Sequence, residues 1–388
     1  MKRNYLITIL LLIVACSAFA GSKDKESHKE SHMTMGESRS QTFQVGKGGT
    51  LEVSVSAGDI FVSPWEKAEV FVKADGIDQD EIENLKMTQV GNTVRVSFHP
   101  EWGAHHMKFT FNIPTDYNTD LHTSGGDIHL QGIFRGTLEG STSGGDIRLG
   151  DVEGRVDMST SGGDIVSGKI TGTTTLRTSG GDIQMTDCSG DVDVSTSGGN
   201  INVGNVGKTL SARTAGGDIV IGNVGGEATI STAGGEIRVG KVTGSVTMKT
   251  AGGDIELKGG SGLIRAKTAG GDIGLTDLTG SVEASTAGGD ISAELRPSGK
   301  GRSTLSSSGG DVVIYLPANS KANIDALIDI RGRWDEGEFD ITSDFKPATY
   351  EKKRDTKEIH ATFELNGGGE SIWLETVNGN IQVRQLNK

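Results

Sequence analysis

Apolar and polar residues alternate along most of this chain, and the alternation returns at a fixed interval. Between residues 123 and 311, a phrase of the form Thr-Ser/Ala-Gly-Gly-Asp-Ile occurs eleven times, with small changes in some copies. The acidic positions of successive copies lie 19, then eight times 18, then 21 residues apart. A near-constant period of this length is typical of a solenoid in which every coil is one repeat. The pattern predicts an all-β, single-chain parallel β-solenoid with about 18 residues per coil and β caps at both ends.

Within one coil, residues 146–163, parity assigns each side chain to the inside or the outside. The inward set is apolar and consists of Ile147, Leu149, Val152, Val156 and Met158. Because stacked coils lie about 4.8 Å apart, we expect the residue after each acid to form one apolar column. The expected column is Ile128, Ile147, Ile165, Ile183, Ile201, Ile219, Ile237, Ile255, Ile273, Ile291 and Val312.

Aromatic residues mark the two ends of the array. None lies between Phe134 and Tyr315, and large rings fit caps better than thin coils. Residues 42–121 alternate as further strands, with one short helix expected at residues 78–87. Further variants of the repeat phrase occur at residues 56–60 and 376–381, within the segments expected to form the caps. The expected organisation is a signal peptide at residues 1–20, a flexible polar linker at 21–41, an amino-terminal β cap at 42–121, the repeat array at 122–316 and a carboxyl-terminal β cap at 317–388.

The first twenty residues have the pattern of an export signal. Lys2 and Arg3 form a positive start, an apolar segment follows, and residues 18–20 before Gly21 form a small-x-small cleavage site. A second interpretation uses the same stretch, because residues 13–16 resemble a bacterial lipobox that would make Cys16 the lipidated first residue. In both cases we expect an exported protein of the periplasm, the outer membrane or the cell surface, attached to a membrane only if Cys16 carries lipid.

Composition and charge exclude several classes of function. The chain has 59 glycines but only 6 prolines, which is unlike collagen or a Pro/Gly-rich disordered polymer. Lys and Arg number 38 against 51 Asp and Glu, a formal net charge of -13, whereas nucleic-acid binding needs a basic face. We therefore expect no nucleic-acid partner. The expected partner is a component of the cell envelope or surface, and exposed strand edges at the array's ends also permit self-association.

The repeated acid is the main candidate for site chemistry. Stacked coils place these acids in a column, in which unit charges 4.8 Å apart repel by about 1 kcal/mol in water. One explanation is that each acid accepts hydrogen bonds from turn amides, which Asn200 favours because it keeps the acceptor without the charge. The other is calcium, although each coil offers one regular acid where calcium takes six to eight oxygens. The candidate calcium ligands are Asp127, Asp146, Asp164, Asp182, Asp218, Asp254, Asp272 and Asp290. Apart from this calcium, no cofactor is expected.

No catalytic constellation stands out, so the sequence predicts a protein that is not an enzyme. A polysaccharide lyase or hydrolase needs paired carboxylates or a base beside a groove, whereas every repeat carries similar polar residues. A carbohydrate-active β-helix enzyme with its site at a cap is the alternative. The clusters that such a site could use are Trp102, His105 and His106, and Trp334, Asp335 and Glu336.

The order of these segments resembles the bacterial putative-adhesin family known as domain of unknown function 4097, whose members are β-strand repeat proteins with Gly-Asp-Ile turns. The likeness covers about residues 42–386, from the variant at 56–60 through Pro114, the array and residues 315–317 to the variant at 376–381. The resemblance implies adhesion and transfers no catalytic residues. The predicted function is a non-enzymatic exported cell-envelope β-solenoid, an adhesin or structural scaffold. A polymer-forming envelope scaffold resembling bactofilins is a further alternative.

Overall fold

The computed structural model describes residues 37–100, 107–297, 301–332 and 338–386. The chain divides into two compact units, Met1–Met35 and Gly36–Lys388, and all described residues belong to the second. These residues form 33 β-strands and one 3-10 helix, η1 (Ile82–Asn84), so the predicted all-β class is confirmed. A search of them for a helix long and apolar enough to cross a membrane finds none. The expected signal peptide with Cys16, and both cap clusters around Trp102 and Trp334, lie outside the described residues.

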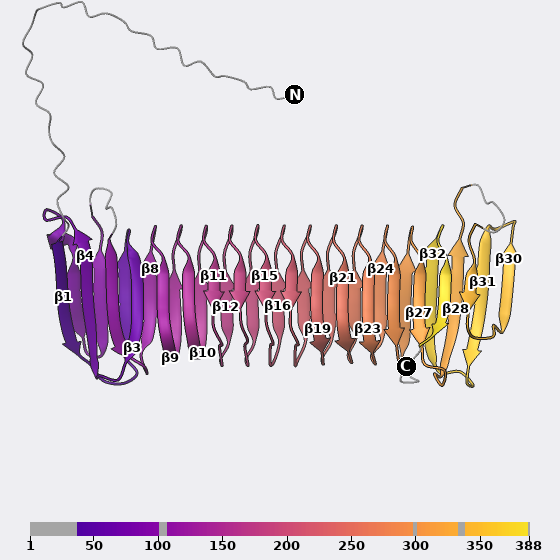
Figure 1. Cartoon of the computed structure of the whole chain (residues 1–388), viewed down its shortest axis with the longest axis horizontal. Coiled ribbons are helices and arrows are strands. Elements are labelled where there is room, and N and C mark those ends of the chain that lie inside the picture. Colours follow the sequence, from indigo (N-terminus) through magenta and orange to yellow (C-terminus); the bar gives the residue numbers. More distant parts are fainter. Residues whose placement is uncertain (1–36, 101–106, 298–300, 333–337, 387–388) are drawn as a thin grey trace, which may run out of the picture. The chain divides into compact units, whose positions relative to one another are not determined.

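One coil of the array consists of two short strands. β11 (Ile165–Ser167) follows the acid of the repeat, and β12 (Thr174–Arg177) ends just before the next Gly-Gly turn. Each strand pairs in parallel with its counterpart one coil further on: Ile165 is the partner of Ile183, and Leu176 is the partner of Val194. The coils therefore stack in register as two layers of strands, the first and second sheets (Figure 1). This arrangement confirms the predicted parallel solenoid.

The two sheets run the whole length of the unit, and two long strands, β9 and β10, belong to both. The first sheet contains, in order, β1 (Glu37–Gln44), β4 (Glu69–Ile77), β7 (Lys108–Pro114), β3 (Asp59–Trp65), β9 (Ile128–Ser141), β10 (Ile147–Ser159), β11, β13 (Ile183–Met185), β15 (Ile201–Val203), β17 (Ile219–Ile221), β19 (Ile237–Val242), β21 (Ile255–Gly260), β23 (Ile273–Leu278), β25 (Ile291–Leu295), β27 (Val312–Leu316), β33 (Ile381–Gln385) and β29 (Ile341–Ser343). The second sheet contains β5 (Lys86–Val90), β6 (Thr93–Phe98), β2 (Thr50–Val55), β8 (Asn118–Thr123), β9, β10, β12, β14 (Val192–Ser195), β16 (Leu210–Arg213), β18 (Ala228–Ser231), β20 (Val246–Lys249), β22 (Ile264–Lys267), β24 (Val282–Thr286), β26 (Arg302–Ser307), β32 (Glu370–Val377), β28 (Ala322–Asp329), β31 (Glu358–Leu365) and β30 (Thr349–Lys353).

The core is a stack of identical or similar apolar side chains. The predicted isoleucine column is confirmed, since each member is the register partner of the next and all are 1% exposed or less. The column extends beyond the array, because Ile60 pairs with Ile128 and Ile381 pairs with Val312. The phrase variants at residues 56–60 and 376–381 therefore occupy coils of the same stack.

A second apolar column closes the other edge of each coil. Single parallel bridges connect Val152, Ile170, Cys188, Val206, Val224 and Val242, one residue per coil. Cys188 is 2% exposed and takes the place that valine or isoleucine has in neighbouring coils. The thiol is thus one more small side chain of the core, and its Sγ donates a hydrogen bond to the carbonyl oxygen of Gly172 at 3.2 Å.

Both ends of the stack change from parallel to antiparallel pairing. At one end β4 pairs antiparallel with β7 and with β1, and at the other β28 and β30 pair antiparallel with β31. The outermost strand β30 exposes all five of its residues, including Glu351, Lys352 and Lys353. Charged, exposed edge strands disfavour pairing with another chain.

Two expectations about the amino-terminal part are wrong. The helix expected at residues 78–87 is a single 3-10 turn, η1, and strand β5 already begins at Lys86. The segment expected to be linker, residues 21–41, includes the start of β1 at Glu37. β1 has few apolar residues, and its order comes from the antiparallel ladder with β4 and from Phe43, which is buried.

Candidate functional site

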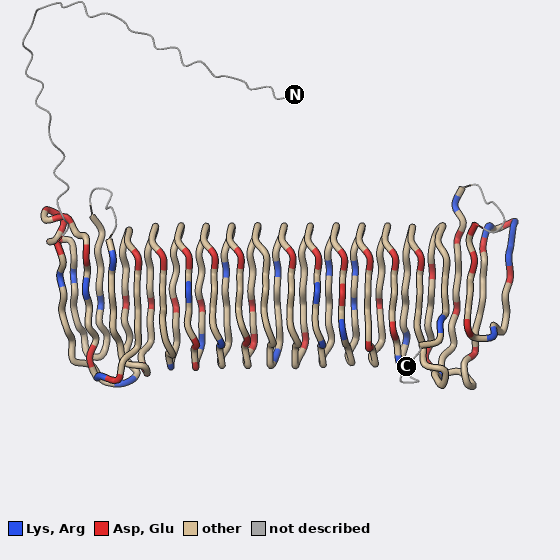
Figure 2. Tube along the Cα trace, in the orientation of Figure 1, with Lys and Arg blue, Asp and Glu red and all other residues tan. Residues whose placement is uncertain are grey.

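The acid of each repeat forms a hydrogen bond to the next coil. Oδ1 of Asp146 accepts a hydrogen bond from the backbone N–H of Asp164 at 2.9 Å, and Oδ1 of Asp164 accepts one from Asp182 at 2.8 Å. Ten more side chains of this column accept the same hydrogen bond, at 2.7–3.0 Å: Asp59, Asp127, Asp182, Asn200, Asp218, Asp254, Asp272, Asp290, Asp311 and Asn380. We call this column the Asp ladder; in Figure 2 it is the file of acidic residues near one edge of the coils.

Two members of the ladder show what the position requires. Asn200 accepts from the N–H of Asp218 at 2.9 Å, so the neutral amide oxygen is sufficient. Glu236 is one methylene longer, and its carboxylate forms an ion pair with Arg238. In the described part of the chain the N–H of Asp254 donates no hydrogen bond to the Glu236 carboxylate, which makes this the one interrupted step within the array.

The threonine of the phrase joins coils from inside the turn. Oγ1 of Thr160 donates to the carbonyl oxygen of Gly145 in the preceding coil at 2.8 Å and accepts from the N–H of Gly163 at 3.3 Å. Every threonine of this column makes both contacts and is only 3–8% exposed. Ser307 makes them in the last coil of the array. The hydroxyls are therefore part of the structure and are not a surface.

The second glycine of each pair is required by close stacking. A Cβ on Gly163 would lie 2.1 Å from the carbonyl oxygen of Gly145, whereas a Cβ on the first glycine, Gly162, would lie 3.3 Å from Gly144. None of these paired glycines has a φ in the left-handed region. Of the two reasons for glycine at such a corner, close approach applies and positive φ does not.

The structure engages one carboxylate oxygen of nearly every acid in the column with a backbone amide. Across the described ranges, no group of three or more His, Cys, Asp and Glu side chains is placed to hold a metal ion. Calcium binding by the aspartates from Asp127 to Asp290 stays a prediction that a chelator can test.

A hydrogen-bonded serine, histidine and aspartate lie on the outer face of the second sheet, and sequence reasoning missed them. Nδ1 of His122 is 2.7 Å from Oγ of Ser141, and Nε2 is 2.7 Å from Oδ1 of Asp120. Asp120 and His122 are two residues apart on β8, and Ser141 is the register partner of His122 on β9. Strand parity together with the 19-residue interval between His122 and Ser141 could therefore have predicted that the three side chains lie on one face.

This chain of three groups lacks the surroundings of a hydrolytic site. The His122 side chain is 53% exposed, and β8 lies between β2 and β9, so its backbone amides are used in sheet ladders. Acyl transfer by a Ser-His-Asp triad depends on donors aimed at a developing oxyanion in a water-excluded site. The three residues are arranged as a surface hydrogen-bond network.

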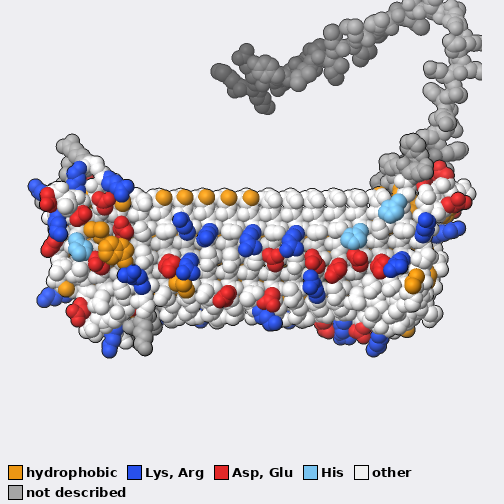
Figure 3. Space-filling view, turned by 180° about the vertical axis from the view of Figure 1, so that it is seen from behind, with side chains coloured by type: hydrophobic (Ala, Val, Ile, Leu, Met, Phe, Trp, Pro, Cys, Tyr) orange, Lys and Arg blue, Asp and Glu red, His pale blue; other side chains and the backbone are white. Residues whose placement is uncertain are grey.

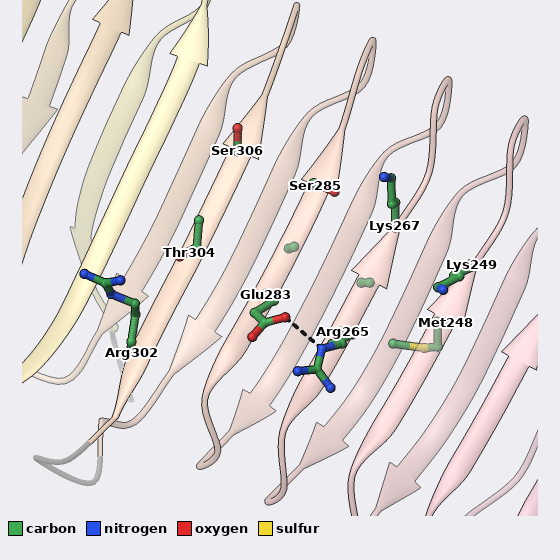
Figure 4. A pocket seen from close by; sticks show the side chains of 11 residues that line it. Met248, Lys249, Arg265, Lys267, Glu283, Ser285, Arg302, Thr304 and Ser306 are labelled. Carbon is green, nitrogen blue, oxygen red and sulfur yellow. Dashed lines mark hydrogen bonds and ion pairs between the residues drawn. The ribbon is translucent and has the colours of Figure 1, made fainter.

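The outer face of the second sheet has a hollow of about 430 Å³ over β20, β22, β24 and β26 (Figure 4). We call it the basic groove. Its charged and hydroxyl side chains are Lys249, Arg265, Lys267, Glu283, Ser285, Arg302, Thr304 and Ser306. Figure 3 shows this face, along which lysine and arginine side chains follow one another. Strand parity predicts the outward positions of single coils, but Arg302 follows the longest repeat interval, so the repeat does not align it with the lysines.

The fold and the Asp ladder define the class of protein: a parallel β-solenoid whose coils are joined by side-chain as well as backbone hydrogen bonds. The chain belongs to the Toastrack family (Toastrack DUF4097), whose model matches residues 49–223, 190–344 and 226–384. The resemblance to this family is thereby confirmed. No curated protein matches the sequence.

Several solved structures match this chain, and three of them are from Parabacteroides. One from Parabacteroides distasonis, named as a putative adhesin, has 16% identity and a TM-score of 0.33, covering 66% of this chain and 97% of its own. A putative adhesin from Parabacteroides merdae has 10% identity and a TM-score of 0.27, covering 91% and 97%. A putative lipid binding protein from Parabacteroides distasonis has 12% identity and a TM-score of 0.23, covering 90% and 97%.

Proposed function

We propose that this protein is a non-enzymatic, exported β-solenoid of the cell envelope that presents an adhesive outer face on a rigid scaffold. One observation carries the proposal: the threonine, glycine and aspartate of the repeat are used between coils, as Thr160, Gly163 and Asp146 show. The repeated phrase thus serves stacking, and the outward positions are free to differ from coil to coil. A long surface of this kind is suited to display and attachment.

Export belongs to the same proposal and rests on the first twenty residues. The mature chain begins either at Gly21 after signal cleavage or at a lipidated Cys16, and the partner is a component of the envelope or of another surface. Mass spectrometry of the amino-terminal peptide from the native host distinguishes the two starts. A mature protein that retains Met1 would contradict export.

The absence of enzymatic function is tested at the best constellation among the described residues. We expect purified protein to hydrolyse p-nitrophenyl acetate no faster than its Ser141→Ala variant, because Ser141 and His122 are open to water. Turnover that disappears in Ser141→Ala would contradict the proposal. Glycan-degrading activity of the unmodified protein would support the cap-site enzyme instead.

The charged edge strands favour a discrete rod over a filament. β30 exposes Glu351, Lys352 and Lys353, and β1 exposes seven of its eight residues. We therefore propose that the protein does not polymerise end to end. Light scattering at high protein concentration should give the mass of one chain, and filaments would favour the polymer-forming scaffold.

Adhesion is tested by display. The protein, placed on the surface of a non-adherent bacterial host, should retain cells on surfaces coated with polysaccharide or with bacterial envelope under flow. The matched control is the same host displaying an unrelated β-solenoid of similar length. Equal retention of both hosts would remove the adhesive function.

A further inference from the structure

We infer that the basic groove binds an extended anionic polysaccharide, whose carboxylate or sulfate groups contact Lys249, Lys267 and Arg302. This inference deepens the proposed adhesive function and rests on it. The groove lies on the outer face of the second sheet, where nothing in the described part of the chain covers it (Figure 4).

The first argument is two adjacent lysines without acidic partners. Lys249 and Lys267 are direct register partners on β20 and β22, and both are exposed. No carboxylate of the described residues forms an ion pair with either of them. Like charges directly opposite on neighbouring strands, about 4.8 Å apart, destabilise a sheet unless an anion lies between them.

The same face shows how the chain arranges basic residues elsewhere. Arg177 and Arg213 are separated by Ser195 in the same row, and both approach Asp193, at 2.6 and 3.8 Å. There the positive charge is spaced and neutralised. In the basic groove Lys249 and Lys267 are adjacent, and neither forms an ion pair with another described residue, so this region differs from the other coils.

The groove gathers further positive charge around a floor of small hydroxyl side chains. In the row of the lysines, Ser285 and Ser306 follow Lys267, and their short side chains leave the hollow open. Arg265 pairs with Glu283 at 2.8 Å, whereas Arg302 has no ion pair within the described residues. Lys249, Lys267 and Arg302, which form no ion pair with another described residue, concentrate positive charge in a chain of formal charge -13 and so form a local anion site.

An aromatic ring lies next to this floor. Trp373 on β32 is the register partner of Thr304 and is half-buried, and its Nε1 donates to Oε2 of Glu375 at 3.1 Å. Cations, hydroxyl groups and the face of a fixed indole are the groups that contact an acidic sugar chain. The cations and hydroxyl groups of the basic groove are spread over several coils, and this spacing fits an extended polymer better than a compact anion.

The experiment measures binding of the purified full chain to polygalacturonate and to dextran sulfate at 0.15 M salt, with neutral dextran as the negative probe. The double variant Lys249→Ser/Lys267→Ser is compared with Arg177→Ser/Arg213→Ser, which makes the same substitution in the same row. Serine occupies this position in sibling coils, at Ser231 and Ser285, so both variants should fold. Equal melting temperatures of the two variants verify this.

We expect the lysine variant to lose at least about tenfold in affinity for one of the anionic polymers, and the arginine variant to lose less than about threefold. Whether polygalacturonate or dextran sulfate responds identifies carboxylate or sulfate as the recognised group. Equal losses of affinity in both variants would mean that binding depends only on the overall charge of this face, and would overturn the inference. So would unmodified protein that binds neither polymer, or that binds a single-stranded oligonucleotide more tightly.

The outcomes are separable from those of the display experiment. Polymer binding in solution by a protein that fails to retain cells would remove the adhesive function and leave the groove assignment intact. Retention of cells that persists in the lysine variant would leave adhesion intact and place it elsewhere on the molecule.

Discussion

The backbone N–H of Asn200 donates to Oδ1 of Asp182 at 2.7 Å, from one coil to the next. This contact explains why an acid or its amide recurs every 18 residues. It predicts that Asp182→Asn changes the free energy of unfolding by less than about 0.5 kcal/mol, whereas Asp182→Ala lowers it by about 1–2 kcal/mol, because only alanine removes the acceptor. Denaturant unfolding measures both. Equal losses would show that the charge itself is what matters.

The stacked glycines predict an unequal effect within one turn. A Cβ on Gly199 would lie 2.0 Å from the carbonyl oxygen of Gly181, and one on Gly198 would lie 3.3 Å from that of Gly180. Gly199→Ala should therefore destabilise by about 3 kcal/mol or more, since neighbouring coils must separate. Gly198→Ala is the matched control and should cost about 1 kcal/mol or less. Similar melting temperatures for the two variants would argue against close stacking.

The buried threonine column predicts the order of two substitutions. Oγ1 of Thr196 donates to the carbonyl oxygen of Gly181 at 2.9 Å and accepts from Gly199 at 3.3 Å. Thr196→Val keeps the shape but loses both hydrogen bonds, and should lower the free energy of unfolding by about 2 kcal/mol. Thr196→Ser keeps the hydroxyl, as Ser307 does, and should lose less than about 1 kcal/mol. Valine tolerated as well as serine would contradict this role.

Chelation tests the remaining calcium hypothesis for the Asp ladder. Because backbone amides bind one oxygen of these carboxylates, we expect dialysis against EDTA to leave the melting temperature unchanged. A ligand present at a hundred times its dissociation constant would add about 2.7 kcal/mol, so its removal would be easy to detect. A clear fall in melting temperature, restored by calcium, would make the aspartates of the ladder calcium ligands.

Tyr117 gives a pH dependence at alkaline pH. Burial raises the pKa of Tyr117 from 10.0 to about 12, opposed by a backbone hydrogen bond with Thr50, and its hydroxyl donates to the carbonyl oxygen of Asn92 at 2.6 Å. Because the folded-state pKa is the higher one, this stabilisation is complete below pH 10 and is lost as pH rises towards 12.

The Tyr117→Phe variant isolates that effect. Its free energy of unfolding should be lower than that of the unmodified protein at pH 8, and the difference should shrink between pH 10 and 12. Denaturant unfolding at several pH values measures it. Parallel curves over this range would mean that the pKa of Tyr117 is not raised.

The repeat was sufficient to predict the solenoid and its isoleucine column, because an 18-residue period and strand parity leave few arrangements. The variants at residues 56–60 and 376–381 were recognised as copies of the phrase but assigned to the caps, whereas Ile60 and Ile381 continue the isoleucine column. Where the period is absent, prediction failed: η1 was expected to be a longer helix, and β1 to be linker. There the outcome depends on pairing with strands that are distant in sequence.

The candidate site needed the structure for two reasons. The sequence indicated amide donors for the acids but placed them in the same turn, whereas the donor to Asp146 belongs to Asp164 in the next coil. The basic groove combines Lys249 and Lys267 with Arg302 from a longer repeat, and Trp373 from beyond the array is the register partner of Thr304 in its lining. Only the register brings these side chains to one face.

The carboxyl-terminal segment meets the last coil through the contacts that also join the coils to one another. Oγ1 of Thr376 donates to the carbonyl oxygen of Gly310 at 2.6 Å, and the N–H of Asn380 donates to Oδ1 of Asp311 at 2.7 Å. At the opposite end, the N–H of Asp127 donates to Oδ1 of Asp59 at 3.0 Å. The contacts at the two ends of the array therefore do not depend on the number of coils between them. Duplicating or deleting one 18-residue unit would lengthen or shorten the solenoid by about 4.8 Å. The number of encoded repeats therefore sets the length of the molecule.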